Sequence, residues 1–195
     1  LEDALERPFA GIYETYMIPN IDEDIEVRLD ELSRAMRLVY ASTYSADSKS
    51  YIESTPNRLE EEKMAVIIQQ IAGMRHDDYL YPNAAGVARS YDYYPVKGAT
   101  AEDGVASLAL GLGRMVVEGG RTVRFSPAHP SRLYQFSSTK DYLNNSQRDF
   151  YALDLSRPAP VRSATDQPES NLALLAIEDA EKHGTLTPVA STYSP

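Results

Sequence analysis

The feature that most constrains how this chain can fold is an apolar segment interrupted by glycines, Ser107–Gly120. A mostly apolar run ending at Leu110 breaks at Gly111 and Gly113, and a second short run breaks at Gly119-Gly120. This pattern predicts a buried strand, a turn and the start of a short helix. Glycines in such a turn let backbone N–H groups approach a ligand, and a helix start behind them favours a phosphate group. A tight turn between two buried elements is the alternative interpretation.

Composition and charge exclude several classes of function. The chain has 195 residues, enough for one sizeable core or one domain with an appendage, and a net charge of −10. Such an acidic surface disfavours binding to a nucleic-acid backbone. The absence of cysteine excludes disulfides and thiolate metal sites, and no apolar run is long enough to cross a membrane. We therefore expect a cytoplasmic protein without nucleic-acid or membrane partners, and the start at Leu1 indicates a fragment of a longer chain.

Two helices are predicted in the first third of the chain. Residues 21–41 carry an apolar stripe at three- and four-residue spacings, with acidic residues in the first turns and Asn20 or Asp22 as the cap. We expect this stripe to be core. Residues 45–53 are predicted as a short second helix.

The middle of the chain is rich in strand patterns. Residues 64–72 are too short and too rich in β-branched side chains for a helix, and we expect a central strand ending near Gln69 and Gln70. Residues 9–18 are predicted as a loop entering a strand. Further strands are expected over 84–94, 104–110, 121–125 and 148–155, separated by polar connections at 73–83 and 131–147.

The last part of the chain is predicted as a linker, 158–168, and an amphipathic helix, 171–182. Ser170 or Asn171 caps this helix and Gly184 ends it. Strands therefore dominate the middle, with helices before and after. This order predicts the α+β class with a mostly antiparallel sheet.

Several common chemistries have no support in the sequence. There is no Gly-x-x-x-x-Gly-Lys-Ser/Thr phosphate loop and no Gly-x-Gly-x-x-Gly dinucleotide turn. His76, His129 and His183 lie far apart in unlike contexts, which disfavours a zinc site or a serine triad. No metal-ligating residue is therefore predicted.

Five segments, taken together, resemble one known family. Phe9-Ala-Gly-Ile-Tyr-Glu-Thr15 is similar to the Phe-Ala-Gly-Gln-x-Asp/Glu-Thr loop of the phosphoenolpyruvate synthase and pyruvate phosphate dikinase family. Ala35-Met-Arg-Leu-Val-Tyr-Ala-Ser-Thr-Tyr44 resembles its Ala-x-x-x-Val-Phe/Trp-Ala-Ser-Leu-Phe helix. Met64-Ala-Val-Ile-Ile-Gln-Gln-Ile71 resembles its Val-Ala-Val-x-Val-Gln-x-Met strand. Ala85-Gly-Val-Ala-Arg-Ser90 resembles Ser-Gly-Val-Ala-Phe-Ser/Thr, and Gly111-Leu-Gly-Arg-Met-Val-Val-Glu-Gly119 resembles Gly-Leu-Gly-Glu-x-Val-Val-x-Gly.

The resemblance implies a partial ATP-grasp domain over 1–157, followed by a linker and helix over 158–195. In this family ATP, with Mg²⁺, phosphorylates a histidine on a separate domain, and a third domain passes the phosphoryl group to pyruvate. The other domains of the full-length chain are therefore the expected partners, and the fragment alone is expected to be inactive. A homo-oligomer is left open.

The resemblance also implies a set of nucleotide-binding residues. Gly11 and Thr15 would lie on the loop over the triphosphate, Gln69 would line the nucleotide pocket, and Gly111 and Gly113 would allow close packing beside it. Arg114 stands where the family has an acid, so it either contacts phosphate or pairs with Glu118 four residues on.

Two further departures from the family pattern leave the function open. Ile12 replaces a loop glutamine, and Arg89 replaces an apolar aromatic. A sister dikinase acting on an antibiotic or a glucan is one alternative to the pyruvate-dependent enzyme. A degenerate, non-catalytic member kept for binding or regulation is the other.

Overall fold

The computed structural model describes residues 11, 13–54, 64–133, 135–157 and 171–190. The chain divides into two compact units, each of which is described here by itself. Unit 1 comprises residues 1–71 and 155–171, and unit 2 comprises residues 72–154 and 172–195. The linker predicted over residues 158–168, the helix cap predicted at Ser170 and the loop position Ile12 lie outside the described residues.

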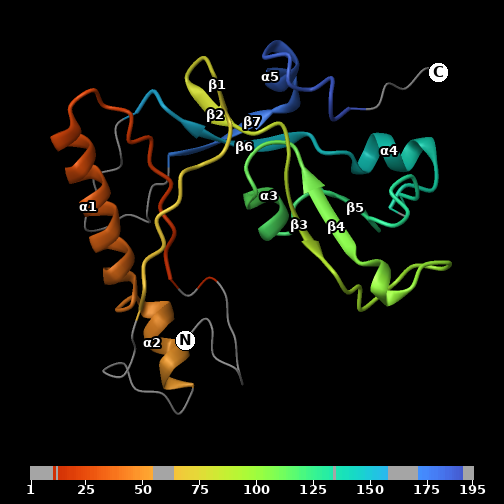
Figure 1. Ribbon diagram of the computed structural model, residues 1–195, viewed down its shortest axis with the longest axis horizontal. Helices are drawn as coiled ribbons and strands as arrows, with labels where there is room; N and C mark the ends of the chain where they lie inside the picture. The colour runs from red at the N-terminus through yellow and green to blue at the C-terminus, as the bar shows by residue number, and fades with distance from the viewer. Residues whose placement is uncertain (1–10, 12, 55–63, 134, 158–170, 191–195) are drawn as a thin grey trace. The chain divides into compact units, whose positions relative to one another are not determined.

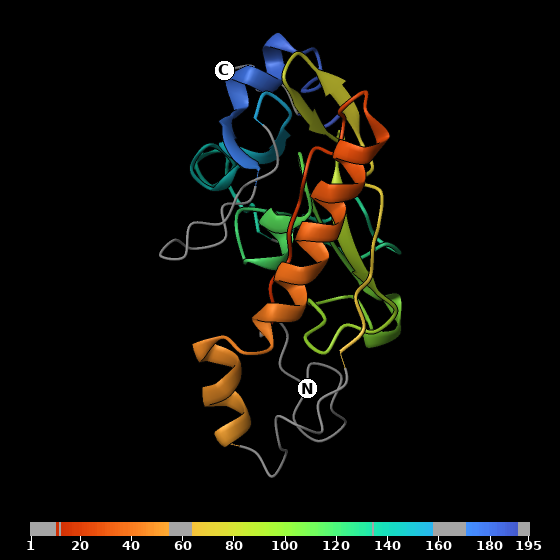
Figure 2. The same cartoon turned by 90° about the vertical axis from the view of Figure 1, so that its left-hand side faces the viewer.

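Unit 1 contains the helices α1 (Ile25–Ser42) and α2 (Ala46–Glu53), joined by a short turn (Figure 2). Both helices predicted in this region are confirmed. The cap of α1 is Asp24, whose carboxylate accepts from the Glu26 N–H at 2.9 Å, rather than Asn20 or Asp22. Asp22 instead accepts from the Asp24 N–H at 2.8 Å. The carboxylates of Asp22 and Asp24 therefore both accept backbone N–H groups at the start of α1 and stabilise it.

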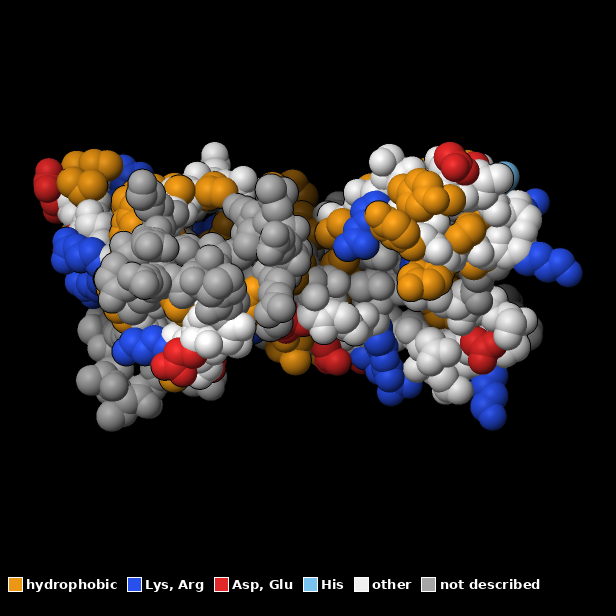
Figure 3. Space-filling model, turned by 90° about the horizontal axis from the view of Figure 1, so that it is seen from below, with side chains coloured by type: hydrophobic (Ala, Val, Ile, Leu, Met, Phe, Trp, Pro, Cys, Tyr) orange, Lys and Arg blue, Asp and Glu red, His pale blue; other side chains and the backbone are white. Residues whose placement is uncertain are grey.

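The apolar stripe of α1 is not core, contrary to the sequence prediction. Ile25 is 61% exposed and Leu29 is 55% exposed, and Ser42 is the one described residue of the helix that is buried. The physical reason is that an amphipathic pattern states only that a face needs a partner. The described part of unit 1 contains no strand that could provide one. Figure 3 shows hydrophobic side chains at the surface on the face seen from below.

Serines organise the junction between α1 and α2. The Ser45 hydroxyl caps α2 by accepting from the Ser48 N–H at 3.1 Å, and the fully buried Ser48 hydroxyl donates to the Ser42 carbonyl at 2.8 Å. The Ser42 hydroxyl also accepts from the Glu14 N–H at 3.1 Å. This contact ties the extended N-terminal segment to the end of α1.

Two strands expected in unit 1 are absent from the residues that the structure describes. Residues 64–72 adopt no regular secondary structure, and Ile67 is 81% exposed. The described residues of 9–18 also form no strand. A β-branched run becomes a strand only where a neighbouring strand completes its hydrogen bonds, and the sequence of the run does not reveal whether one exists.

Unit 2 contains a four-stranded sheet in the order β1-β2-β6-β7, with every neighbouring pair antiparallel (Figure 1). Its strands are β1 (Met74–His76), β2 (Tyr79–Tyr81), β6 (Asp149–Asp154) and β7 (Leu172–Ala176). The β6 prediction is confirmed. The β1–β2 hairpin lies in a predicted connection, so that prediction was wrong. The helix predicted over 171–182 is wrong in its first half, which forms β7, and is confirmed in its second half, where residues 177–182 are helical.

A second sheet of unit 2 has three antiparallel strands in the order β3-β4-β5 (Figure 1). They are β3 (Ala85–Arg89), β4 (Val105–Ala109) and β5 (Val123–Phe125), with the short 3₁₀ helix η2 (Ala101–Asp103) before β4. All three strands agree with the sequence prediction, although β3 ends at Arg89 and not at Tyr94. The α+β class with antiparallel sheets and flanking helices is thereby confirmed, and it is consistent with a partial ATP-grasp-like domain.

Within its described residues, unit 2 also contains the short helices α3 (Arg114–Val117), α4 (Thr139–Asn145) and α5 (Ile177–Lys182). The predicted helix start after Gly113 is confirmed as α3. Helix α4 was missed, although Ser138 and Asp141 form a capping box at its start. Hydrogen bonds from the Ser137 and Ser138 side chains lower the pKa of Asp141 below its ordinary value. Among the described residues, none of the helices combines the length and hydropathy that crossing a bilayer would require.

The core of unit 2 is centred on β6. Phe150 and Ala152 are fully buried, and the ring of Phe150 lies 4.8 Å from that of the fully buried Tyr81. Two histidines that lie far apart in the chain, His76 and His183, join this cluster. The rings of His76 and His183 stack at 5.4 Å, and Nδ1 of His183 lies 2.9 Å from the Tyr81 hydroxyl.

Two adjacent leucines of β7, Leu174 and Leu175, test where the core of unit 2 lies. Leu175 pairs with Phe150 and is 9% exposed, whereas its neighbour Leu174 pairs with Tyr151 and is 59% exposed. We expect Leu175→Ala to lower the free energy of unfolding by about 2–5 kcal/mol, and Leu174→Ala by less than about 1 kcal/mol. Chemical denaturation of the full-length protein measures both values. Equal losses would place the core elsewhere.

His76 predicts a dependence of stability on pH. Its Nε2 is buried without a hydrogen-bond partner among the described residues, and burial, followed by the charge of His183, lowers its pKa from the ordinary value of 6.5. The unfolded chain therefore binds a proton at His76 at a higher pH than the folded chain does. The contribution of neutral His76 to the free energy of unfolding is thus fully present well above pH 6.5 and is lost as the pH falls below 6.5.

We expect His76→Phe to reduce this decrease between pH 7 and pH 5. His129→Phe is the control, because His129 lies outside the cluster of His76, Tyr81 and His183. Its Nε2 is 3.7 Å from an Asp103 carboxylate oxygen in a different part of unit 2. Thermal unfolding across this pH range compares both variants with the wild type. Equal pH profiles for His76→Phe and the wild type would contradict the assignment.

Candidate functional site

The glycine segment forms a turn that joins the two sheets of unit 2. The Leu112 N–H, beyond the end of β4, donates to the Tyr151 carbonyl of β6 at 2.8 Å. The Gln147 side chain forms hydrogen bonds with both backbone groups of Leu110, the residue before Gly111. Its Oε1 accepts from the Leu110 N–H at 2.8 Å, and its Nε2 donates to the Leu110 carbonyl at 3.0 Å. The turn is therefore fixed to β6 and not free in solvent.

Gly111 is required by both conformation and space. Its φ of +82° lies in the left-handed region that favours glycine. A Cβ at this position would lie 2.6 Å from the Tyr151 carbonyl oxygen and 2.8 Å from Cδ2 of Phe150. The space that a Cβ would need is thus filled by the backbone and the Phe150 ring of β6. Close packing beside a nucleotide pocket stays a prediction for this glycine.

Gly113 has no comparable requirement. Its φ of −62° is helical, and a Cβ would make an ordinary 3.8 Å contact with Cβ of Ala85. Its carbonyl accepts from the Val116 and Val117 N–H groups at 3.0 and 3.2 Å and so begins α3. The two glycines of one motif therefore have different physical roles.

Arg114 is engaged within its own helix turn. Its Nε donates to Oε1 of Glu118 at 2.6 Å, and its guanidinium lies 5.4 Å from the centre of the Tyr151 ring. Of the two predicted partners, the structure shows Glu118. Half of the Arg114 side chain remains accessible, at 42% exposure, and a phosphate contact by this residue stays a prediction.

The other predicted site residues belong to unit 1. Gly11 has a φ of +88°, and a Cβ there would meet no atom within 4 Å. Thr15 and Gln69 are exposed. Gly111, Gly113 and Arg114 are thus brought together in one turn of unit 2, whereas Gly11, Thr15 and Gln69 lie on irregular segments of unit 1. Arg89, at the end of β3, is also exposed.

The described residues provide no metal site. No group of three or more histidine and acidic side chains within them is arranged to hold an ion. The acidic residues before α1 are explained by capping.

Comparison with known families identifies the chain. Residues 1–154 match the family described as pyruvate phosphate dikinase, AMP/ATP-binding domain. The chain belongs to this family. It is therefore a nucleotide-binding segment of a protein related to pyruvate phosphate dikinase. No curated protein and no solved structure matches it.

The pyruvate phosphate dikinase match includes the glycine turn and ends at Asp154, the last residue of β6. Sequence reasoning found the turn but missed the residues that hold it, Gln147 and Tyr151. An amide two residues before a strand carries no distinctive sequence signal. The pairing of Arg114 with Glu118 could be found from its four-residue spacing.

The two glycines test this account of the AMP/ATP-binding domain. Gly111→Ala places a methyl group against the β6 backbone at a positive φ, so we expect the free energy of unfolding to fall by about 2 kcal/mol or more. Gly113→Ala is the matched control and should change it by less than about 1 kcal/mol. Chemical denaturation of the full-length protein checks both. Equal effects would show that the turn is not packed against β6 as described.

Proposed function

We propose that this chain is the nucleotide-binding part of a phosphoenolpyruvate synthase-like dikinase. In the proposed reaction ATP transfers one phosphoryl group to a histidine on a separate domain of the full-length chain, and that histidine then phosphorylates pyruvate to phosphoenolpyruvate. Water accepts the second phosphoryl group of ATP, which leaves as free phosphate, and AMP remains. The observation that carries the proposal is the family match over residues 1–154, which spans the glycine turn and all five resembling segments.

The proposed roles of the residues follow their positions. Gly111 shapes the turn by packing on β6, Gly113 begins α3, and Arg114 is the cationic side chain at its start. Gly11 and Thr15 would supply an N–H group and a hydroxyl to the triphosphate, and Gln69 would line the nucleotide. Phosphoryl transfer depends on positioning and on charge neutralisation more than on covalent chemistry by the protein. These neutral donors would position the nucleotide, and the phosphate charge would be balanced by the metal ion that accompanies ATP and by cationic side chains.

Magnesium enters this proposal only as the ion that accompanies ATP in phosphoryl transfer. Three-residue ligand clusters are missing from the described parts of both units, so we assign no magnesium ligand to them.

A non-catalytic member of the family is the second candidate. The observation that favours it is the position of Arg114, which replaces the family's acid and is engaged by Glu118 and Tyr151. In that case the domain would bind a partner or a nucleotide without transferring the phosphoryl group.

Titration of the full-length protein with Mg²⁺-ATP by calorimetry tests the proposal. We expect saturable binding, and product analysis with pyruvate should then show AMP and phosphoenolpyruvate. No detectable heat at millimolar nucleotide would overturn the nucleotide-binding proposal. Binding without AMP formation would favour the non-catalytic candidate.

The pair Arg114→Gln and Glu118→Gln separates the two roles of Arg114 in the same titration. If Arg114 contacts phosphate, Arg114→Gln should weaken ATP binding by about tenfold, since a charge-assisted contact contributes about 1.5–3 kcal/mol. Glu118→Gln should leave ATP binding unchanged or tighter, because it releases the guanidinium. A purely structural pair would instead give unchanged affinity in both variants and a small, similar loss of stability.

A further inference from the structure

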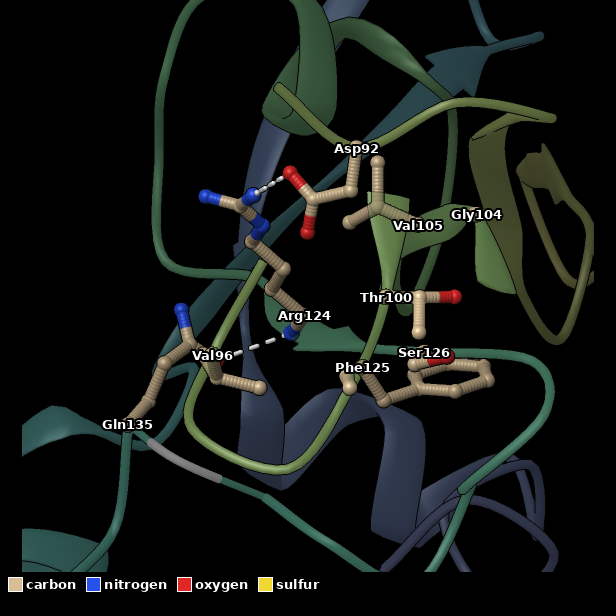
Figure 4. Close-up of a pocket in the computed structure, with 10 residues that line it drawn as sticks. Asp92, Val96, Thr100, Gly104, Val105, Arg124, Phe125, Ser126 and Gln135 are labelled. Carbon is tan, nitrogen blue, oxygen red and sulfur yellow. Dashed lines mark hydrogen bonds and ion pairs between the residues drawn. The ribbon is translucent and has the colours of Figure 1, made fainter. Parts of the chain in front are cut away.

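A second feature of unit 2 is a pocket beside the three-stranded sheet, which shares no lining residue with the glycine turn (Figure 4). Its volume is about 160 Å³. The residues that matter for its chemistry are Asp92, Val96, Val105, Arg124, Phe125 and Gln135. We call it the Asp92 pocket.

The pocket contains an ion pair that is fixed on its acidic side. Oδ1 of Asp92 accepts from Nη2 of Arg124 at 2.7 Å and from the Tyr94 N–H at 3.0 Å. The Asp92 side chain is 11% exposed, whereas that of Arg124 is 44% exposed. Within the described residues, Oδ2 of Asp92 and the Nε and Nη1 groups of Arg124 have no hydrogen-bond partner. An acceptor and several donors are therefore available to a ligand.

Gln135 adds a donor on the basic side. Its Oε1 accepts from the Arg124 N–H at 2.8 Å, and this contact leaves its amide NH₂ group to donate elsewhere. Figure 4 shows the amide nitrogen of Gln135 on the same side as the guanidinium of Arg124. Val96, Val105 and Phe125 provide apolar surface beside these polar groups.

We propose that the Asp92 pocket binds a small aliphatic α-amino acid. A free anion would face the Asp92 carboxylate, and a free cation would face the Arg124 guanidinium. A zwitterion satisfies both, with its carboxylate on Arg124 and Gln135 and its ammonium on Oδ2 of Asp92. The aliphatic side chain would lie on Val96 and Val105. The volume is close to that of an engineered cavity that holds benzene, about 150 Å³, which restricts the ligand to a small molecule.

Calorimetric titration of the full-length protein with L-valine tests this assignment. Isovalerate lacks the ammonium group, isobutylamine lacks the carboxylate, and both should bind at least about tenfold more weakly than L-valine, because each loses one charge-assisted contact. L-Phenylalanine should be excluded by size, and inorganic phosphate by the Asp92 charge. Absence of heat with L-valine, or equal binding of isovalerate or phosphate, would overturn the proposal.

Three variants locate the binding. Arg124→Gln removes the guanidinium, and Ala99→Leu fills the pocket without changing its charge, since Ala99 is one of its half-buried lining residues. Arg121→Gln is the control, because Arg121 is exposed and its Nη1 lies 3.4 Å from the Ser146 carbonyl, outside the pocket. We expect L-valine binding to weaken by about tenfold or more in the first two variants and to be unchanged in the third.

Thermal unfolding confirms that each variant is folded. L-Valine binding that survives both Arg124→Gln and Ala99→Leu would overturn the proposal. This proposal does not rest on the proposed dikinase function. L-Valine can bind when Mg²⁺-ATP does not, and Mg²⁺-ATP can bind when L-valine does not, so the two titrations test the two proposals separately.

Discussion

The contact on which unit 2 depends is the packing of a side-chain-free residue, Gly111, against the backbone of β6. Beside it, the Leu112 N–H donates to the Tyr151 carbonyl at 2.8 Å, and the Gln147 amide holds Leu110 from both sides. These bonds connect the end of β4, in the three-stranded sheet, to β6, in the four-stranded sheet. The joint tolerates no Cβ, because a methyl group would meet a buried carbonyl oxygen and an aromatic ring.

The same joint determines where α3 begins. Helix α3 contacts β3, β4 and β6, so its first residues are held by both sheets. Arg114 follows directly and reaches Glu118 and the ring of Tyr151, a residue whose carbonyl also anchors the turn. A change of charge at the position after the glycines is therefore absorbed locally by one acid and one aromatic ring. This explains how an arginine is accommodated at this position of the turn.

The sequence predicted elements well where the signal is local. Helices α1, α2 and α3 and strands β3 to β6 follow from caps, glycine breaks and alternation. Prediction from the sequence failed where the structure of a segment depends on whether another segment of the chain packs beside it. The β-branched run at Ile67 is exposed because the described part of unit 1 offers no neighbouring strand, and Leu172–Ala176 is a strand because β6 offers one. The stacking of His76 on His183 joins residues distant in sequence, which periodicity cannot reveal. The turn at Gly111 could be predicted because its signal is local, whereas the nucleotide-binding roles of Thr15 and Gln69 depend on neighbouring groups and stay predictions.

Strand β7 shows that the limit of family similarity is not the limit of folding. The family match ends at Asp154, yet the chain returns at Leu172 to pair with β6 from Asp149 to Leu153. A protein shortened to the matched residues would keep every recognisable motif and lose one side of its central strand. The uncovered strand would present unpaired N–H and C=O groups beside Phe150, an edge that promotes aggregation. Shortening the AMP/ATP-binding domain at its similarity boundary would thus convert a buried core strand into an adhesive edge.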